Sequence, residues 1–283
     1  MADNKAYEKK VAELLYKTGR LQDREVEKIL VLLEQLRRQL TDTVAASEWQ
    51  VWRIKEMKAA VNAATEQFRL AYAASQEGAL ANMWEAGQDL IAAPLAEAGF
   101  YVSISQIPRT ALEVMQAYSG DLIGGLSADI RKKVTNEIIM GVMGGKGQTE
   151  VMKAIGLNLK ESGIMKGIGA RAEAITRTET GRINSLAREA RIQATIEAAP
   201  EIEWRKKWHS SGKLHPRYPH KMLDQVTVPI DDNFLGYIPY PHAPGLSAAE
   251  TINCGCTHTL VAADWDDVPD NGPVVYHERA IYN

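Results

Sequence analysis

The fold of the N-terminal half is decided by the stretch Val26-Glu-Lys-Ile-Leu-Val-Leu-Leu-Glu-Gln-Leu-Arg-Arg-Gln-Leu-Thr-Asp-Thr-Val44. Its apolar residues recur at three- and four-residue steps, the spacing of one face of an α-helix: Val26, Ile29, Leu30, Leu33, Leu36, Leu40 and Val44. Neither glycine nor proline occurs between Gly19 and Gly78, and Asp23 can cap the start of a helix. The pattern predicts long N-terminal helices.

A second apolar stripe follows, formed by Trp52, Ile54, Met57, Val61, Phe68 and Tyr72. One continuous helix over residues 21–77 would be about 85 Å long, which far exceeds a helix of a globular domain. We therefore expect either a new helix starting at Thr41-Asp42-Thr43 or a projecting antiparallel helical hairpin. Trp49 and Trp52 are candidate interface residues, because aromatic side chains anchor protein interfaces. Packing of both against another helix is the competing interpretation.

Further helices are expected along the rest of the first 199 residues. They cover about residues 79–97, 126–144, 149–157 and 168–198. Residues 100–108 alternate briefly between apolar and polar side chains, which is typical of a short strand or an extended connector.

Proline and histidine divide the chain sharply near Ala199–Pro200. Residues 200–283 hold nine of the eleven prolines, all six histidines and both cysteines. Short strands are expected at residues 204–208, 226–230 and 256–262, with Arg205, Lys206 and Lys207 on a solvated strand edge. The predicted fold class is mainly α: long N-terminal helices or a helical hairpin, then a small C-terminal α+β domain.

This organisation predicts four regions. Residues 1–110 form a helical assembly or docking region, and residues 111–199 form a helical region that leads into the C-terminal module. Residues 200–263 form a small α+β domain that holds the cysteines and most histidines, with helix 168–198 packed on it. Residues 264–283 form an extended C-terminal arm.

Composition narrows the class of protein. The 33 Lys and Arg residues against 36 Asp and Glu give a net charge of −3, so bulk positive charge does not favour nucleic-acid binding. No apolar run approaches the roughly 20 residues that span a membrane, and the N-terminus has no apolar signal-peptide core. Folding in a cytosol is expected. A disulfide between Cys254 and Cys256 would be strained, so none is expected.

Cys254, Cys256, His215 and His220 are candidate zinc ligands. Thiolates and imidazoles are the side chains that zinc prefers, and the His-x4-His spacing suits metal binding. Against zinc, Cys-x-Cys is tighter than the usual spacing, and two cysteines on one strand face can pack as small apolar groups. The sequence leaves both interpretations open. Asp224, Asp231 and Asp232 are not spaced as a metal-nuclease cluster.

Three separated segments carry a resemblance to a known family. They are Ala174-Ile-Thr-Arg-Thr-Glu-Thr-Gly-Arg-Ile-Asn184, then Trp208-x5-Leu214-His-Pro-Arg-x-x-His220-x-x-Leu223-Asp with Val228-Pro-Ile-Asp231, and Asn253-Cys-Gly-Cys256. In this order they resemble the Mu F-like minor head protein family of tailed phages, over about residues 120–262. The chain departs from the family at Gly255, where a basic residue is common, and at Gln225, where a glycine is common.

The resemblance implies a structural protein of the virion without enzymatic activity. Such proteins are built into the head in few copies, near the portal vertex, and take part in procapsid assembly and in DNA packaging, retention or delivery. The implied partners are the portal protein, the major capsid protein or both, with packaged DNA as a further contact. The expected location is the head interior or portal vertex, and the host cytoplasm during assembly. No cofactor is expected, apart from the zinc that the Cys/His residues allow.

A structural network is expected around the C-terminal module, formed by Arg177, Glu179, Asn184, His220 and Asn253. Arg177 and Asn184 share a helix face and are expected to donate to backbone carbonyls of the loop around His220. The alternative is an enzyme or toxin that transfers a nucleotide or uses a metal, with Arg177, Glu179 and the His/Cys cluster as its site. A DNA-binding packaging accessory is a further alternative, which predicts binding that weakens steeply with salt.

Overall fold

The computed structural model describes residues 4–104, 107–211, 217–263 and 265, and the chain forms two compact units. The helical unit comprises residues 22–79 and 114–177, and the sheet unit comprises residues 1–21, 80–113 and 178–283. The fold is mainly α-helical with one small antiparallel sheet near the C-terminus, as predicted. The predicted C-terminal arm, residues 264–283, lies outside the described residues except for Trp265.

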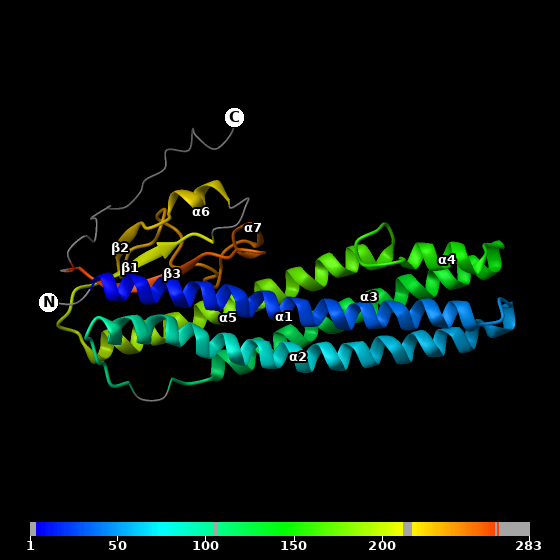
Figure 1. Ribbon diagram of the computed structural model, residues 1–283, viewed down its shortest axis with the longest axis horizontal. Helices are drawn as coiled ribbons and strands as arrows, with labels where there is room; N and C mark the ends of the chain where they lie inside the picture. The colour runs from blue at the N-terminus through cyan, green and yellow to red at the C-terminus, as the bar shows by residue number, and fades with distance from the viewer. Residues whose placement is uncertain (1–3, 105–106, 212–216, 264, 266–283) are drawn as a thin grey trace. The chain divides into compact units, whose positions relative to one another are not determined.

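A helical hairpin forms one side of the helical unit. Helix α1 spans Asn4–Ala46, a 3-10 turn η1 spans Val51–Arg53, and α2 spans Ile54–Glu97. Within the unit α1 and α2 run antiparallel (Figure 1), which confirms the predicted hairpin. The alternative of a new helix at Thr41 is wrong, because the Thr41 hydroxyl donates to the carbonyl of Arg37 inside α1 at 3.2 Å. Asp23 also lies inside α1 and does not cap it.

Of the other helices, the two long ones begin earlier than the apolar pattern suggested, and the short one between them ends earlier. Helix α3 spans Thr110–Gly144, α4 spans Gln148–Ile155 and α5 spans Ile164–Ala198. Helix α2 continues through Gly78 and includes Pro94, so the separate helix expected at residues 79–97 is wrong. The described part of residues 100–108 is a connector and not a strand. Within the described residues, no helix is both long and apolar enough to cross a bilayer.

The core of the helical unit is built from the two predicted stripes of α1 and α2 together with one face each of α3, α4 and α5. Its fully buried residues include Leu33, Leu36, Leu40, Val61, Tyr72, Ile123, Leu126, Ile130, Val134, Ile138, Val151, Ile155, Met165 and Ala172. The Tyr72 hydroxyl donates to the carbonyl of Ala172 at 2.9 Å, so even the polar end of this ring is satisfied inside the core.

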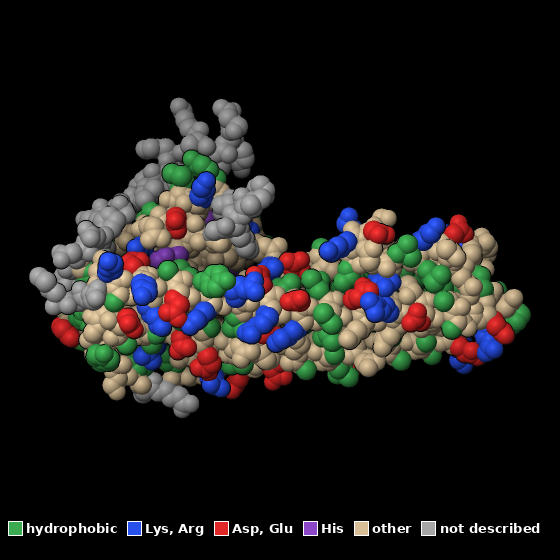
Figure 2. All heavy atoms as spheres, viewed as in Figure 1, with side chains coloured by type: hydrophobic (Ala, Val, Ile, Leu, Met, Phe, Trp, Pro, Cys, Tyr) green, Lys and Arg blue, Asp and Glu red, His purple; other side chains and the backbone are tan. Residues whose placement is uncertain are grey.

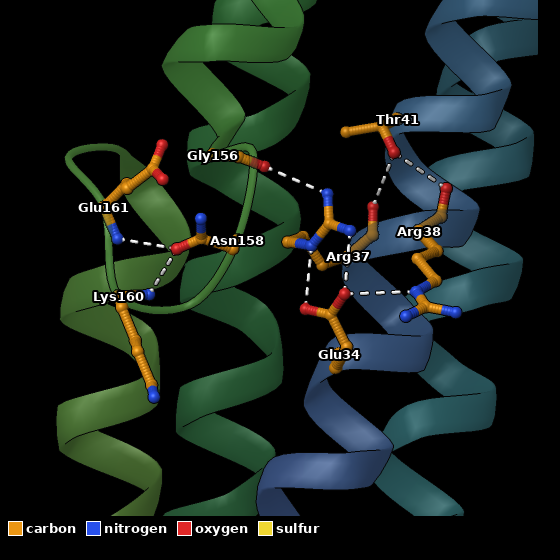
Figure 3. Close-up of polar contacts among 8 residues, drawn as sticks. All are labelled: Glu34, Arg37, Arg38, Thr41, Gly156, Asn158, Lys160 and Glu161. Carbon is orange, nitrogen blue, oxygen red and sulfur yellow. Dashed lines mark hydrogen bonds and ion pairs between the residues drawn. The ribbon is translucent and has the colours of Figure 1, made fainter.

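One buried arginine ties α1 to the loop that follows α4 (Figure 3). The Arg37 guanidinium makes two hydrogen bonds of 2.8 Å to the carboxylate of Glu34 and a third, of 3.2 Å, to the carbonyl of Gly156. In the same loop, the side chain of Asn158 accepts the backbone N–H groups of Lys160 and Glu161, each at 2.8 Å. These bonds satisfy backbone groups that an irregular loop would otherwise leave unpaired.

The sheet of the sheet unit has the order β2-β1-β3, and all its pairings are antiparallel. Strand β1 spans Trp204–His209, β2 spans Thr227–Pro229 and β3 spans Thr257–Ala262. The strands fall where the sequence predicted them, but β1 is the central strand, so the interpretation of its basic residues as a strand edge is wrong. Lys206 is buried, and its ammonium lies 5.7 Å from the centre of the Phe234 ring.

Two apolar clusters flank this sheet. The first joins the start of α1 to β3: the Tyr7 ring lies edge-on to Trp265 at 4.8 Å, and its hydroxyl donates to the carbonyl of Leu260 at 2.6 Å. The second surrounds Trp208 and contains Leu223, Val226, Val228, Phe234, Ile238, Cys254 and Cys256. The N-terminal turns of α1 are therefore part of the folded sheet unit.

Candidate metal centre

The second cluster gathers one histidine and both cysteines. His220 lies on the short helix α6 (Tyr218–Met222), and Cys254 and Cys256 lie just before β3. The Nδ1 atom of His220 is 3.5 Å from the sulfur of Cys254 and 3.7 Å from that of Cys256. The three atoms that can bind a metal all lie within 4.8 Å of one another, and all three side chains are buried. The three side chains therefore converge on one place in the cluster around Trp208.

The backbone before β3 places the two thiols on one side. Helix α7 (Ala248–Thr251) ends in a turn in which the N–H of Cys254 donates to the carbonyl of Thr251 at 3.1 Å. Asn253 has a φ of 55°, a left-handed conformation that asparagine adopts more readily than most residues. Its N–H donates to the hydroxyl of Thr178 on α5 at 3.1 Å, which fixes the turn against that helix. Cys254 and Cys256, two residues apart, then face the same way.

The ring of His220 is oriented by a carboxylate. Its Nε2 lies 2.5 Å from an oxygen of Glu250 on α7. A carboxylate there keeps the imidazole proton on Nε2, so Nδ1 presents its lone pair to the sulfurs. The edge of the ring also contacts Trp208, at 5.4 Å between centroids. The arrangement is a carboxylate–imidazole pair directed at two thiols.

The thiols of Cys254 and Cys256 form a hydrogen bond with each other, which shifts the pKa of both. Their mutual hydrogen bond lowers the pKa of Cys254 against the effect of burial, and His220 lowers it further. The same hydrogen bond, together with burial, raises the pKa of Cys256. Arg188 of α5 is fully buried, and burial lowers its pKa to about 9 against the opposing effects of Cys254, Glu189 and Cys256.

Helix α5 closes against this region through a glycine. A Cβ at Gly181 would lie 2.9 Å from Nε2 of His242, closer than real Cβ contacts come. The same Nε2 atom lies 3.0 Å from the carbonyl oxygen of Cys254. Gly181 therefore leaves the space in which α5 approaches the cysteine-bearing turn. Thr178 holds the two together by its hydrogen bond to Asn253.

Residues 132–259 match the model of a family described as Phage Mu protein F like protein. This region of the chain is phage Mu F-like. The matched residues run from the second half of α3 into β3, and they include His220, Cys254 and Cys256 together with the α5 segment that contains Thr178 and Gly181. The match indicates a phage head morphogenesis protein. No curated protein and no solved structure matches the chain.

Two residues of the predicted structural network, Arg177 and Asn184, lie on helix α5. Arg177 pairs with Asp23 at 2.8 Å and with Glu173 at 2.9 Å. The Asn184 amide donates to the carbonyl of Met83 on α2 at 2.9 Å. Asn184 therefore donates to α2 and not, as expected, to the loop around His220, whereas the expectation for Arg177 stays a prediction. The contact between α5 and the cysteine-bearing turn of the Mu F-like region is made instead by Thr178 and Gly181, which are interleaved with them on the helix.

Glu179, the residue proposed with Arg177 for a catalytic alternative, is buried in the sheet unit. Burial raises its pKa against the effect of Arg182, whose guanidinium lies 2.9 Å away. An arginine pair of this kind satisfies a buried carboxylate, and it leaves the carboxylate directed at a protein partner and not at a substrate.

Two further histidines of the Mu F-like region lie on strands of the sheet and contact neighbouring side chains there. Nε2 of His209 lies 2.8 Å from the hydroxyl of Thr259, and burial lowers the His209 pKa to about 3. The ring of His258 stacks on Tyr240 at 5.3 Å, and burial lowers the His258 pKa to about 4. Both rings are therefore neutral in the folded protein near pH 7. His215, the fourth predicted zinc ligand, lies outside the described residues.

The carboxylates considered for a nuclease do not join the cluster. Asp224 accepts the backbone N–H of Ser210 at 2.7 Å. Within the described part of the chain, the group of three or more His, Cys, Asp or Glu residues placed to hold a metal is His220, Cys254 and Cys256. Sequence reasoning missed Glu250 and Arg188. The sequence gives Glu250 no marker beyond its position four residues before Cys254, and Arg188 is one of several arginines on α5.

The two candidate interface tryptophans occupy different environments in the helical unit. Trp49 is half-buried against the core, and its Nε1 donates to the carbonyl of Lys146 at 2.7 Å. Trp52 lies on η1 and is 71% exposed, beside Val51 at 61%. Trp52 and Val51 form an exposed apolar pair at the turn of the hairpin, called the hairpin tip below.

Proposed function

We propose that this protein is a minor structural component of a tailed-phage head, present in few copies near the portal vertex. The observation that carries the proposal is the Mu F-like match over residues 132–259. On this proposal the protein acts in procapsid assembly and in DNA packaging, retention or delivery, and it works by occupying a place in the particle and not by turning over a substrate.

Two features of the molecule support a structural role. The ionisable residues that an enzyme would use are committed to internal contacts, as Glu179 is to Arg182 and His220 is to Glu250. The helical unit, in contrast, exposes the hairpin tip, and tryptophan is a frequent anchor of protein interfaces. The portal protein or the major capsid protein is the proposed partner of this tip.

Charge does not favour direct binding to DNA as the main activity. On the face shown in Figure 2, Lys and Arg side chains intermingle with Asp and Glu side chains along the helices. Several of these charges pair locally, for example Arg53 with Glu56 and Arg69 with Glu66. A protein that neutralises many phosphates needs unpaired positive side chains along one surface. A role in DNA retention would therefore act through the protein's place in the head.

The experiment that tests the proposal is a count of the protein in purified heads. Quantitative mass spectrometry of heads and of procapsids is expected to find a fixed number of copies, well below that of the major capsid protein. Cross-linking in assembled procapsids is expected to join the hairpin tip to the portal or major capsid protein. Absence of the protein from both particles contradicts the proposal, and so does DNA binding by the isolated protein that falls steeply with salt.

Deletion of the N-terminal region is not a suitable test of docking. Tyr7 and Val11 belong to the apolar cluster of the sheet unit, together with Leu260. Removing them would damage the Mu F-like module as well as the proposed docking surface. Point substitutions at the hairpin tip separate the two effects.

A further inference from the structure

We propose that His220, Cys254 and Cys256 bind a zinc ion, and that Glu250 positions His220 for it. The three ligand atoms lie within 4.8 Å of one another, which is the spacing of ligands around one tetrahedral metal. The sequence alone left open whether the cysteines bind a metal or pack as apolar groups. The geometry decides for a metal.

The position of the imidazole carries most of the argument. Its Nδ1 faces both sulfurs at nearly equal distances, 3.5 and 3.7 Å. A hydrogen bond from one thiol to Nδ1 accounts for one of these contacts, whereas a metal ion bound by all three atoms accounts for both. A ligating histidine has its other nitrogen held by a carboxylate, and the contact of 2.5 Å between Nε2 and Glu250 supplies that support.

The ligand types select zinc among the common cations. Thiolate sulfur is a soft ligand that magnesium and calcium do not use, and a set of two thiolates and one imidazole fits a tetrahedral zinc site. Zinc takes a fourth ligand as well, which a water molecule can supply.

The competing interpretation is a nucleophilic cysteine activated by His220 and Glu250. A nucleophile must reach a substrate, but Cys254 and Cys256 are 3% and 4% exposed. A thiol–imidazole–carboxylate triad also uses one thiol, whereas here both sulfurs face the same nitrogen. A metal explains the second cysteine.

Zinc at this place would cross-link a small module. It joins α6 to the turn before β3 across 34 residues of sequence, inside an apolar cluster of eight buried residues. A cluster of that size stabilises a fold weakly, and small modules commonly add a metal or a disulfide for this reason. The inference holds whether or not the protein is a head component.

The test measures the metal directly. The full chain is expressed in zinc-supplemented medium, purified without chelator and analysed by inductively coupled plasma mass spectrometry. About one zinc ion per chain is expected. Removal of zinc and addition of Co²⁺ is expected to give the near-ultraviolet charge-transfer band of cobalt–thiolate bonds. Wild-type protein that holds no zinc and gives no such band overturns the proposal, without reference to any variant.

Variants then assign the ligands. Cys254→Ser, Cys256→Ser and His220→Ala are each expected to lose most of the bound zinc, and Glu250→Gln is expected to weaken zinc binding roughly 10- to 100-fold. The matched control is Met222→Ala, an exposed position on α6 that is expected to keep its zinc. Undiminished zinc in all three ligand variants would place the metal elsewhere and overturn the assignment.

Alkylation separates zinc from the nucleophile alternative. With zinc bound, both cysteines are expected to resist iodoacetamide, and a chelator is expected to expose them. The zinc-free wild-type chain is also expected to melt at a lower temperature than the zinc-bound chain, because the metal binds the folded state. Rapid alkylation of one cysteine at the same rate with and without zinc overturns the proposal in favour of a reactive thiol.

Discussion

Gly181 of α5 lies directly against His242, with space for no side chain: an added Cβ would come within 2.9 Å of the imidazole Nε2. That Nε2 is also 3.0 Å from the carbonyl oxygen of Cys254, so a hydrogen bond holds the ring in this place. The close approach of helix and turn is therefore a property that only glycine permits at this position.

Gly181→Ala is expected to destabilise the protein by about 1–3 kcal/mol, because the methyl group forces His242 off its partner. Chemical denaturation followed by circular dichroism measures the change. The matched control is Gly167→Ala on the same helix, where an added Cβ meets nothing within 4 Å. The control is expected to be neutral or to stabilise by up to about 1 kcal/mol, because alanine favours helix over glycine. Equal effects of the two substitutions would contradict the close contact.

Stability is expected to fall as the pH drops below about 6.5, because of two buried histidines. Burial lowers the pKa of His209 to about 3 and that of His258 to about 4, from 6.5 in the unfolded chain. Between these values the unfolded chain binds more protons than the folded one, so the free energy of unfolding decreases with falling pH. Each histidine contributes roughly 1.4 kcal/mol per pH unit in that window.

Urea denaturation between pH 8 and pH 4.5, with a chelator present to remove any metal, measures this dependence. His209→Gln is expected to reduce the slope of unfolding free energy against pH by roughly 1.4 kcal/mol per pH unit, because this histidine no longer titrates. Glu189 lies 3.4 Å from Nε2 of His258 and opposes the effect of burial there. A stability that stays constant from pH 6.5 to pH 5 would show that the folded protein takes up as many protons as the unfolded chain, and would contradict the lowered pKa values of the two rings.

Parts of the fold were predictable from sequence because they depend on local spacing. The stripe from Val26 to Val44 defines a helix face whatever it packs against, and the strand that begins at Trp204 shows the alternation of a half-buried strand. The helix boundaries were not predictable. Helix α1 spans Asn4–Ala46, and no glycine or proline near Ala46 marks where it ends.

The parts that failed depend on contacts distant in sequence. The central position of β1 is set by its pairing with β2 and β3, which no property of Lys206 reveals. Likewise, the composition of the α5 motif did not tell which side chains face the cysteine-bearing turn. Asn184 was a chemically conspicuous candidate, but its amide donates to Met83, whereas Thr178 and Gly181 contact the turn. The site residues His220, Cys254 and Cys256 were named from their chemistry, but their convergence required the structure.

Arg37→Ala is expected to destabilise the helical unit by about 2–3 kcal/mol, because the carbonyl of Gly156 loses its buried partner and Glu34 loses its bidentate one. The control is Arg38→Ala on the next position. Arg38 contacts the same Glu34 at 3.1 Å, but its side chain is 70% exposed, so the expected loss is below about 0.5 kcal/mol. Unfolding free energies from denaturant titration measure both, and similar losses in the two variants would contradict the role given to Arg37.

The two tryptophans of the hairpin are expected to respond in opposite ways. Trp49→Ala should lower the melting temperature, because the ring packs on the core and its Nε1 donates to Lys146, and removing such a ring costs about 2–4 kcal/mol. Trp52→Ala should leave the melting temperature within about 1 °C of wild type, since the side chain is 71% exposed. If the hairpin tip docks on the portal or capsid, Trp52→Ala is also expected to lower the number of copies of the protein per head several-fold, as measured by mass spectrometry. Wild-type copy numbers in Trp52→Ala heads would remove the hairpin tip from the interface and leave the docking surface to be sought elsewhere on the chain.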